Sequence, residues 1–147
     1  MREITVAKNA GFCFGVKRAA DSIEKAISSS KGERIYTLGH LIHNPTFNKR
    51  LEDKGVRAVE FAEVEDIARS ATADSPVKLF LRAHGVPLCE EEKLRELHRE
   101  NEFFSYEDCA CPYVKNIHNI AKDNSGDDNF FILMGSASHP EVVGIMS

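Results

Sequence analysis

The sequence predicts an α/β fold, with a mostly parallel sheet and helices on both of its faces. Short apolar runs of strand length alternate along the chain with segments whose apolar residues recur at helical spacing. This alternation favours parallel pairing, because each crossover helix returns the chain to the same end of the sheet. The chain has 147 residues, 42% of them hydrophobic and 29% charged, so it is long enough to bury a core.

The expected strands are runs rich in β-branched and aromatic residues. In chain order they span residues 3–7, 34–38, 78–83, 102–106 and 129–134, and a weaker candidate lies at 56–59. Between the first two, Val16, Ala20, Ile23 and Ile27 follow a helical period. We therefore expect a helix between the strands at 3–7 and 34–38.

The later helices carry start and stop signals. Asn44 is a suitable N-cap, Pro45 a suitable first helical residue and Gly55 a suitable stop. Two further helices are expected within 87–101 and 112–124. A last helical pattern starts at His139 and stops within two turns, so we expect the chain to be truncated.

If there is a domain boundary, we place it near Asp108. Residues 1–108 would form a first α/β lobe, and residues 109–147 the start of a second, truncated lobe. The chain has no apolar run near the roughly 18 residues that span a bilayer and no apolar leader, so we expect a cytoplasmic protein without membrane attachment. A net charge of −4 argues against general nucleic-acid binding.

The chemically capable residues gather where predicted strands meet predicted helices. The residues concerned are Cys13, His40, His43, His84, Cys111, His139 and Glu141. In open parallel sheets, ligands bind beyond the carboxyl ends of the strands, so these loops could converge on one site. Glycines in the same loops let the backbone approach a ligand, and the helix starts that follow favour anions. A phosphate or diphosphate is the expected ligand.

The four cysteines allow more than one interpretation. Cys13 could be a small buried residue, or a thiolate favoured by its place at a helix start near cationic side chains. Cys109 and Cys111 could pack, bind a metal or form a redox pair, although the spacing disfavours a stable disulfide. We assign Cys89 to packing. A zinc site formed by Cys109, Cys111 and histidines is disfavoured by the spacing.

The histidines divide into two groups. His98 and His118 lie inside predicted helices, and we expect them to cap or pack. His43, His84 and His139 each follow a strand beside Gly or Pro, which favours a binding role. Glu141 could stabilise its helix as a first-turn acid, or it could deliver protons beside an anion-binding histidine.

Five motifs in register carry a family resemblance. They are "GFCFGVKRA", "LIHNP", "RAHGV", "DCACPYV" and "SHPEVVGIM". Together they resemble the N-terminal half of the 4-hydroxy-3-methylbut-2-enyl diphosphate reductase family, over nearly the whole chain. The resemblance implies an oxidoreductase of the methylerythritol phosphate pathway of isoprenoid biosynthesis, which converts its allylic diphosphate substrate to isopentenyl and dimethylallyl diphosphates.

The resemblance also implies the architecture and the site residues. The family has three α/β lobes around a 4Fe-4S cluster, and this chain would hold one lobe plus part of a second. Cys13 and Cys111 would be two of three cysteine ligands of the metal cluster. His43, His84 and His139 would contact the substrate, and Glu141 would supply protons. The electron donor would be a ferredoxin or flavodoxin.

Two departures from the family pattern affect the expected activity. Ala110 replaces a frequent threonine, and Cys109 is an additional cysteine. Neither Cys89 nor Cys109 matches the third ligand, so we expect this fragment alone to be weakly active or inactive. The competing hypothesis is a non-catalytic α/β module that binds a phosphorylated metabolite.

Overall fold

The computed structural model describes residues 3–8, 10–126 and 128–147, and within them one parallel sheet forms the centre of the fold. Its strands are β1 (Arg34–Leu38), β2 (Arg57–Val59), β3 (Val77–Leu81) and β4 (Phe104–Asp108). They are arranged in the order β2-β1-β3-β4, and every pairing is parallel. The α/β prediction is confirmed, and the weak candidate at 56–59 is a strand.

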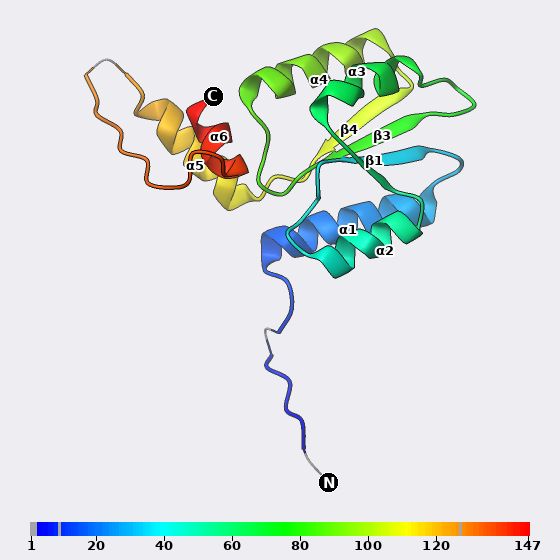
Figure 1. The fold of residues 1–147 in the computed structure, drawn as a ribbon, viewed down its shortest axis with the longest axis horizontal. Coiled ribbons are helices and arrows are strands. Elements are labelled where there is room, and N and C mark those ends of the chain that lie inside the picture. The colour runs from blue at the N-terminus through cyan, green and yellow to red at the C-terminus, as the bar shows by residue number, and fades with distance from the viewer. Residues whose placement is uncertain (1–2, 9, 127) are drawn as a thin grey trace.

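Helices cover both faces of this sheet (Figure 1). On one face lie α1 (Phe14–Ser29) and α2 (Pro45–Asp53), and on the other lie α3 (Phe61–Arg69) and α4 (Leu88–Glu100). The helix α3 was not among the predicted elements. Its signal is a capping box, in which the side chains of Glu60 and Glu63 each accept a hydrogen bond from the backbone N–H of the other residue.

The core has two layers, one on each face of the sheet. The alternation along β3 shows this division, because Val77, Leu79 and Leu81 pack toward α3 and α4 while Phe80 packs toward α1 and α2. All four side chains are buried. The buried apolar faces of these strands and helices are what hold the loops at the sheet edge in place.

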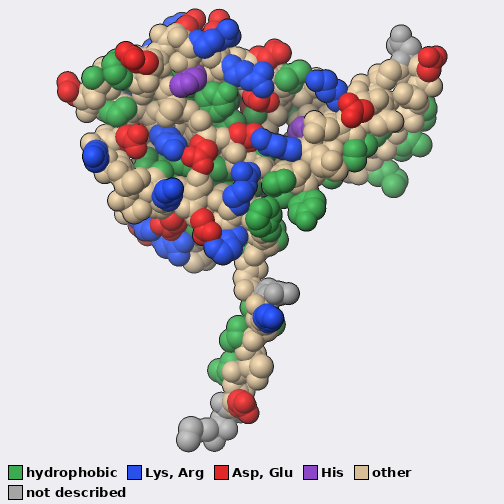
Figure 2. Space-filling model, turned by 180° about the vertical axis from the view of Figure 1, so that it is seen from behind, with side chains coloured by type: hydrophobic (Ala, Val, Ile, Leu, Met, Phe, Trp, Pro, Cys, Tyr) green, Lys and Arg blue, Asp and Glu red, His purple; other side chains and the backbone are tan. Residues whose placement is uncertain are grey.

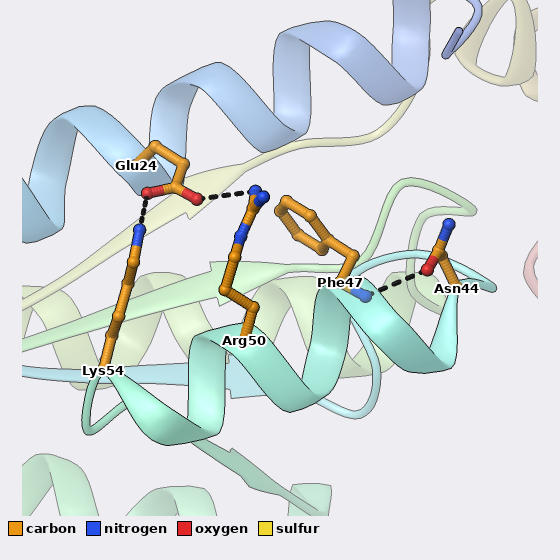
Figure 3. A network of polar contacts seen from close by, with 5 residues as sticks. All are labelled: Glu24, Asn44, Phe47, Arg50 and Lys54. Atoms are coloured by element: carbon orange, nitrogen blue, oxygen red, sulfur yellow. Dashed lines mark hydrogen bonds and ion pairs between the residues drawn. The ribbon is translucent and has the colours of Figure 1, made fainter.

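Polar contacts join α1 to α2 (Figure 3). The carboxylate of Glu24 pairs with Lys54 and, at 2.8 Å, with Arg50. At the start of α2, the side-chain oxygen of Asn44 accepts a hydrogen bond of 2.9 Å from the backbone N–H of Phe47. Asn44 is therefore the N-cap that the sequence predicts, and it anchors the loop that carries His43.

Two predicted strands are absent, and the prediction for them was wrong. Residues 3–7 and 129–134 are irregular and pair with no strand among the described residues. Their apolar side chains stay in solvent, with Ile4 86%, Phe130 93% and Met134 91% exposed. A β pattern forms a strand only where a neighbouring strand satisfies its backbone groups. Figure 2 shows the first of these segments extending away from the body.

Beyond β4, the chain forms α5 (Pro112–Asp123) and α6 (Pro140–Met146), which pack against one another beside the sheet (Figure 1). The domain boundary near Asp108 stays a prediction. None of the helices in the described ranges is long and apolar enough to cross a membrane.

Candidate functional site

The loops that leave β1, β3 and β4 are held side by side by backbone hydrogen bonds. The N–H of Ala83 donates to the carbonyl of Leu41 over 3.1 Å, and the N–H of Cys111 donates to the carbonyl of Ala83 over 2.9 Å. The loops therefore stay hydrogen-bonded to one another beyond the ends of the strands at Leu38, Leu81 and Asp108. These hydrogen bonds align the segments that carry His43, His84 and Cys111.

Three histidines meet at this edge of the sheet. The ring centroids of His43 and His84 are 4.4 Å apart, those of His84 and His139 are 5.8 Å apart, and those of His43 and His139 are 6.3 Å apart. They come from the loop after β1, the turn after β3 and the residue before α6. The structure thus brings together residues that lie far apart in the sequence.

The environment of His84 favours its neutral form. Partial burial lowers the pKa of His84, and the positive charges that His43 and His139 can carry lower it further. The negative charge of the Glu141 carboxylate raises the pKa of His84, so this carboxylate lies near the three histidines. An anion would favour the protonated ring, so anion binding and proton uptake are coupled here.

His139 is the N-cap of α6, which orients its ring. Its Nδ1 accepts a hydrogen bond of 3.3 Å from the backbone N–H of Glu141. In the neutral ring Nε2 then carries the proton and is free to donate. Glu141 lies in the first turn of α6, half-buried.

A groove of about 770 Å3 adjoins the histidines. Polar and charged side chains that line it include His40, His43, Asn48, Lys49, Glu52, Glu60, Arg82 and His84. Arg82 was not among the predicted site residues, although it lies in the "RAHGV" motif. Its Nε donates to the carbonyl of Gly85 over 3.0 Å, so the guanidinium stabilises the turn that carries His84.

The two predicted ligand cysteines lie at the starts of adjacent helices. Cys13 is the exposed N-cap residue of α1, and Cys111 is the half-buried N-cap residue of α5. Gly15, in the first turn of α1, lies directly against Cys111, because a Cβ atom there would meet its Sγ at 2.4 Å. Arg18 adds a hydrogen bond to the carbonyl of Ala110.

The other two cysteines differ in environment. Cys109 packs within the core between the sheet and α1, and burial raises the pKa of its thiol to about 12. It therefore stays protonated, which does not suit a metal ligand. Cys89 is exposed near the start of α4, so its assignment to packing was wrong. A helical pattern alone does not tell which face a residue near the first turn presents.

A group of three or more Cys, His, Asp or Glu side chains arranged to hold a metal ion does not occur in the described part of the chain. His98 is exposed and not packed in the core, and its Nδ1 lies 2.7 Å from the carbonyl oxygen of Phe104. The three histidine rings meet at one edge of the sheet, and the start of α1, which follows Cys13, lies against Cys111.

Comparison with known proteins shows what this chain resembles. The family model described as LytB protein matches residues 4–147. The 4-hydroxy-3-methylbut-2-enyl diphosphate reductase of Caldanaerobacter subterraneus subsp. tengcongensis is 38% identical over 143 residues, which cover 97% of this chain and 46% of the relative. The reductase of the same name from Aquifex aeolicus is 36% identical, over 99% of this chain and 45% of the relative.

Two solved structures are also similar. One, described as (E)-4-hydroxy-3-methyl-but-2-enyl diphosphate reductase, the terminal enzyme of the non-mevalonate pathway, has a TM-score of 0.73 and 35% identity, over 99% of this chain and 47% of that one. The other, a reductase from Plasmodium falciparum, has a TM-score of 0.73 and 27% identity, over 95% and 39%. The chain spans about half the length of the curated relatives it matches.

Proposed function

The chain belongs to the LytB protein family, and on that basis we propose that it forms the N-terminal part of a 4-hydroxy-3-methylbut-2-enyl diphosphate reductase. The proposed reaction is the reductive conversion of this allylic diphosphate to isopentenyl and dimethylallyl diphosphates. Curated relatives that bear the name of that enzyme align with 97–99% of this chain. We expect the chain by itself to be weakly active or inactive.

The observation that carries this proposal is the histidine cluster. Three imidazoles within 6.3 Å of each other, from three separate segments, would be mutually repulsive when charged. A diphosphate would remove that repulsion by neutralising the rings and accepting hydrogen bonds from them. His43, His84 and His139 are therefore the proposed diphosphate contacts, and the adjoining groove would hold the rest of the ligand.

The two cysteines fit as two of the ligands of a 4Fe-4S cluster. Both are the N-cap residues of their helices, at the positive end of the helix dipole. Gly15 leaves room for the Cys111 sulfur beside α1, so the two helix starts approach closely. When bound, the cluster would supply electrons for removal of the allylic hydroxyl. A third cysteine ligand would have to come from outside this chain.

Glu141 is the proposed proton donor. Its carboxylate lies beside the histidine cluster, where it influences the pKa of His84. Departure of a hydroxide requires a proton, and a half-buried carboxyl group next to the diphosphate could deliver it. His139, capping the same helix, would orient Glu141 relative to the substrate. The proposed electron donor is a ferredoxin or flavodoxin.

The first test is iron binding by the 147-residue chain. After anaerobic incubation with iron and sulfide, we expect protein-bound iron that Cys13→Ser and Cys111→Ser each reduce. Cys89→Ser, which changes another exposed thiol, is the matched control and should leave the iron content unchanged. Equal iron in all four proteins would contradict the assignment of the ligands.

The second test separates the reductase from a non-catalytic phosphate-binding module. Calorimetry with inorganic pyrophosphate should show binding that His43→Ala weakens and the remote His98→Gln does not. Pyrophosphate binding in a chain that takes up no iron would favour the module. Absence of pyrophosphate binding would contradict the assignment of the histidines.

A further inference from the structure

His118, in the middle of α5, lies between two segments of the histidine cluster. A Cβ atom at Gly85 would be 3.6 Å from Cε1 of His118, and a Cβ atom at Gly144 would be 3.0 Å from the same atom. Gly85 directly follows His84, and Gly144 lies one turn after Glu141 on α6. The ring thus lies close to both glycines, and an added Cβ atom would make an ordinary contact with it at Gly85 but a crowded one at Gly144.

Hydrogen bonding does not account for this placement. Nε2 of His118 is buried and has no hydrogen-bond partner among the described residues. A buried ring nitrogen without a partner costs free energy, so the fit of the ring between the two glycines must offset that cost. Gly85 also has φ +80°, which favours glycine at this position independently of the contact.

His118 is placed between the turn after β3 and the helix α6. The turn with His84 belongs to the sheet, whereas His139 and Glu141 belong to α6, which packs on α5. The start of α4 and the end of α6 are joined by a hydrogen bond of 3.1 Å from the N–H of Leu88 to the hydroxyl of Ser147. A rigid ring between the two segments is better suited to set their separation than this single hydrogen bond at the end of the chain.

We propose that His118 is a positioning residue, whose ring sets the spacing between His84 on one side and His139 with Glu141 on the other. This inference deepens the proposed function, since it assumes that the three histidines act together. His118 itself is not a proposed substrate contact. Its effect is exerted through Gly85 and Gly144.

The titration of His84 reports that spacing without any ligand. Groups that influence its pKa are His43 from the loop after β1, His139 and Glu141 from the α6 segment, and Arg82 beside it. In His118→Ala, the α6 segment is no longer held at its distance and His84 becomes more hydrated. Because burial is the main cause of the lowered pKa of His84, this pKa should rise toward the ordinary histidine value in the variant.

Nuclear magnetic resonance of the imidazole rings tests this proposal on the full chain. We expect the titration midpoint of His84 to rise in His118→Ala and to stay low in His118→Phe, which keeps a ring of similar size. Leu94→Ala, which opens a gap in the core under α4, is the control for general destabilisation. An unmoved midpoint in His118→Ala, an equal rise in Leu94→Ala, or a rise in His118→Phe would each overturn the proposal.

Pyrophosphate affinity is the second measurement. His118→Ala should weaken binding by about tenfold, because the histidines no longer reach the anion together, and His118→Phe should retain it. Normal affinity in His118→Ala would also overturn the proposal. If the wild-type chain binds no pyrophosphate, the proposed function fails, while the titration of His84 still decides the role of His118.

Discussion

Substituting Gly15 by alanine tests the close approach of α1 to Cys111. An added Cβ atom would lie 2.4 Å from Sγ and 2.9 Å from Cβ of Cys111. Ordinary contacts between heavy atoms are about 3.5–4.0 Å, so both distances are too short. Rotation of the Cys111 side chain could move Sγ but not Cβ. The helix start or the loop before α5 must therefore shift.

Two effects of opposite sign determine how much Gly15→Ala changes the free energy of unfolding. Overpacking of this kind costs about 1–3 kcal/mol. Alanine in place of glycine favours a helix by up to about 1 kcal/mol. We therefore expect Gly15→Ala to lower the free energy of unfolding by about 1 kcal/mol. With an m-value of about 2 kcal/mol per molar urea, the unfolding midpoint should fall by about 0.5 M.

Urea unfolding followed by circular dichroism measures this change, and the Cys111→Gly background is the matched control. There the nearest remaining atom of residue 111 is its Cα, 3.6 Å from the added Cβ, which is an ordinary contact. Gly15→Ala should be neutral or stabilising in that background. The reasoning is refuted if Gly15→Ala stabilises the unaltered chain, as an unstrained helical substitution would.

Three further predictions concern the framework of the site. The hydrogen bond from Lys54 lowers the pKa of Glu24, so this contribution to stability is present above the unfolded-state pKa and is lost as the pH falls through the folded-state value. Glu24→Gln should accordingly cost about 0.5 kcal/mol at neutral pH and nothing in acid, as urea titrations at several pH values would show. Asn44→Ala removes the N-cap of α2 and should cost about 1 kcal/mol in thermal unfolding, whereas an unchanged melting temperature would contradict the capping role. Iodoacetamide should label exposed Cys13 in the native protein and buried Cys109 only after unfolding, as peptide mapping by mass spectrometry would reveal. Equal labelling rates for these two thiols would contradict the burial of Cys109.

The elements that sequence analysis predicted correctly are those with strong local signals. β1 follows from a compact apolar run, and α2 from its N-cap, first-turn proline and terminal glycine. α3 was missed because it follows its strand after a single residue, Glu60, which is not one of the usual N-cap residues. The β patterns at 3–7 and 129–134 resemble those of the true strands, but strand formation depends on a partner that local sequence does not reveal.

By itself, the sequence determined the α/β class, most of the elements, the family resemblance and the placement of His43, His84 and Cys111 after strands, whereas the strands expected before Cys13 and His139 do not form within the residues that the structure describes. The features determined by the sequence depend on local periodicity, capping and motif spacing. The tertiary structure decided the strand order β2-β1-β3-β4 and therefore which loops are neighbours. It placed the rings of His43, His84 and His139 together, buried Cys109, exposed Cys89 and placed His118 between two glycines. Contacts between distant segments set all of these, because hydrogen-bond register and core packing act through space and not along the chain.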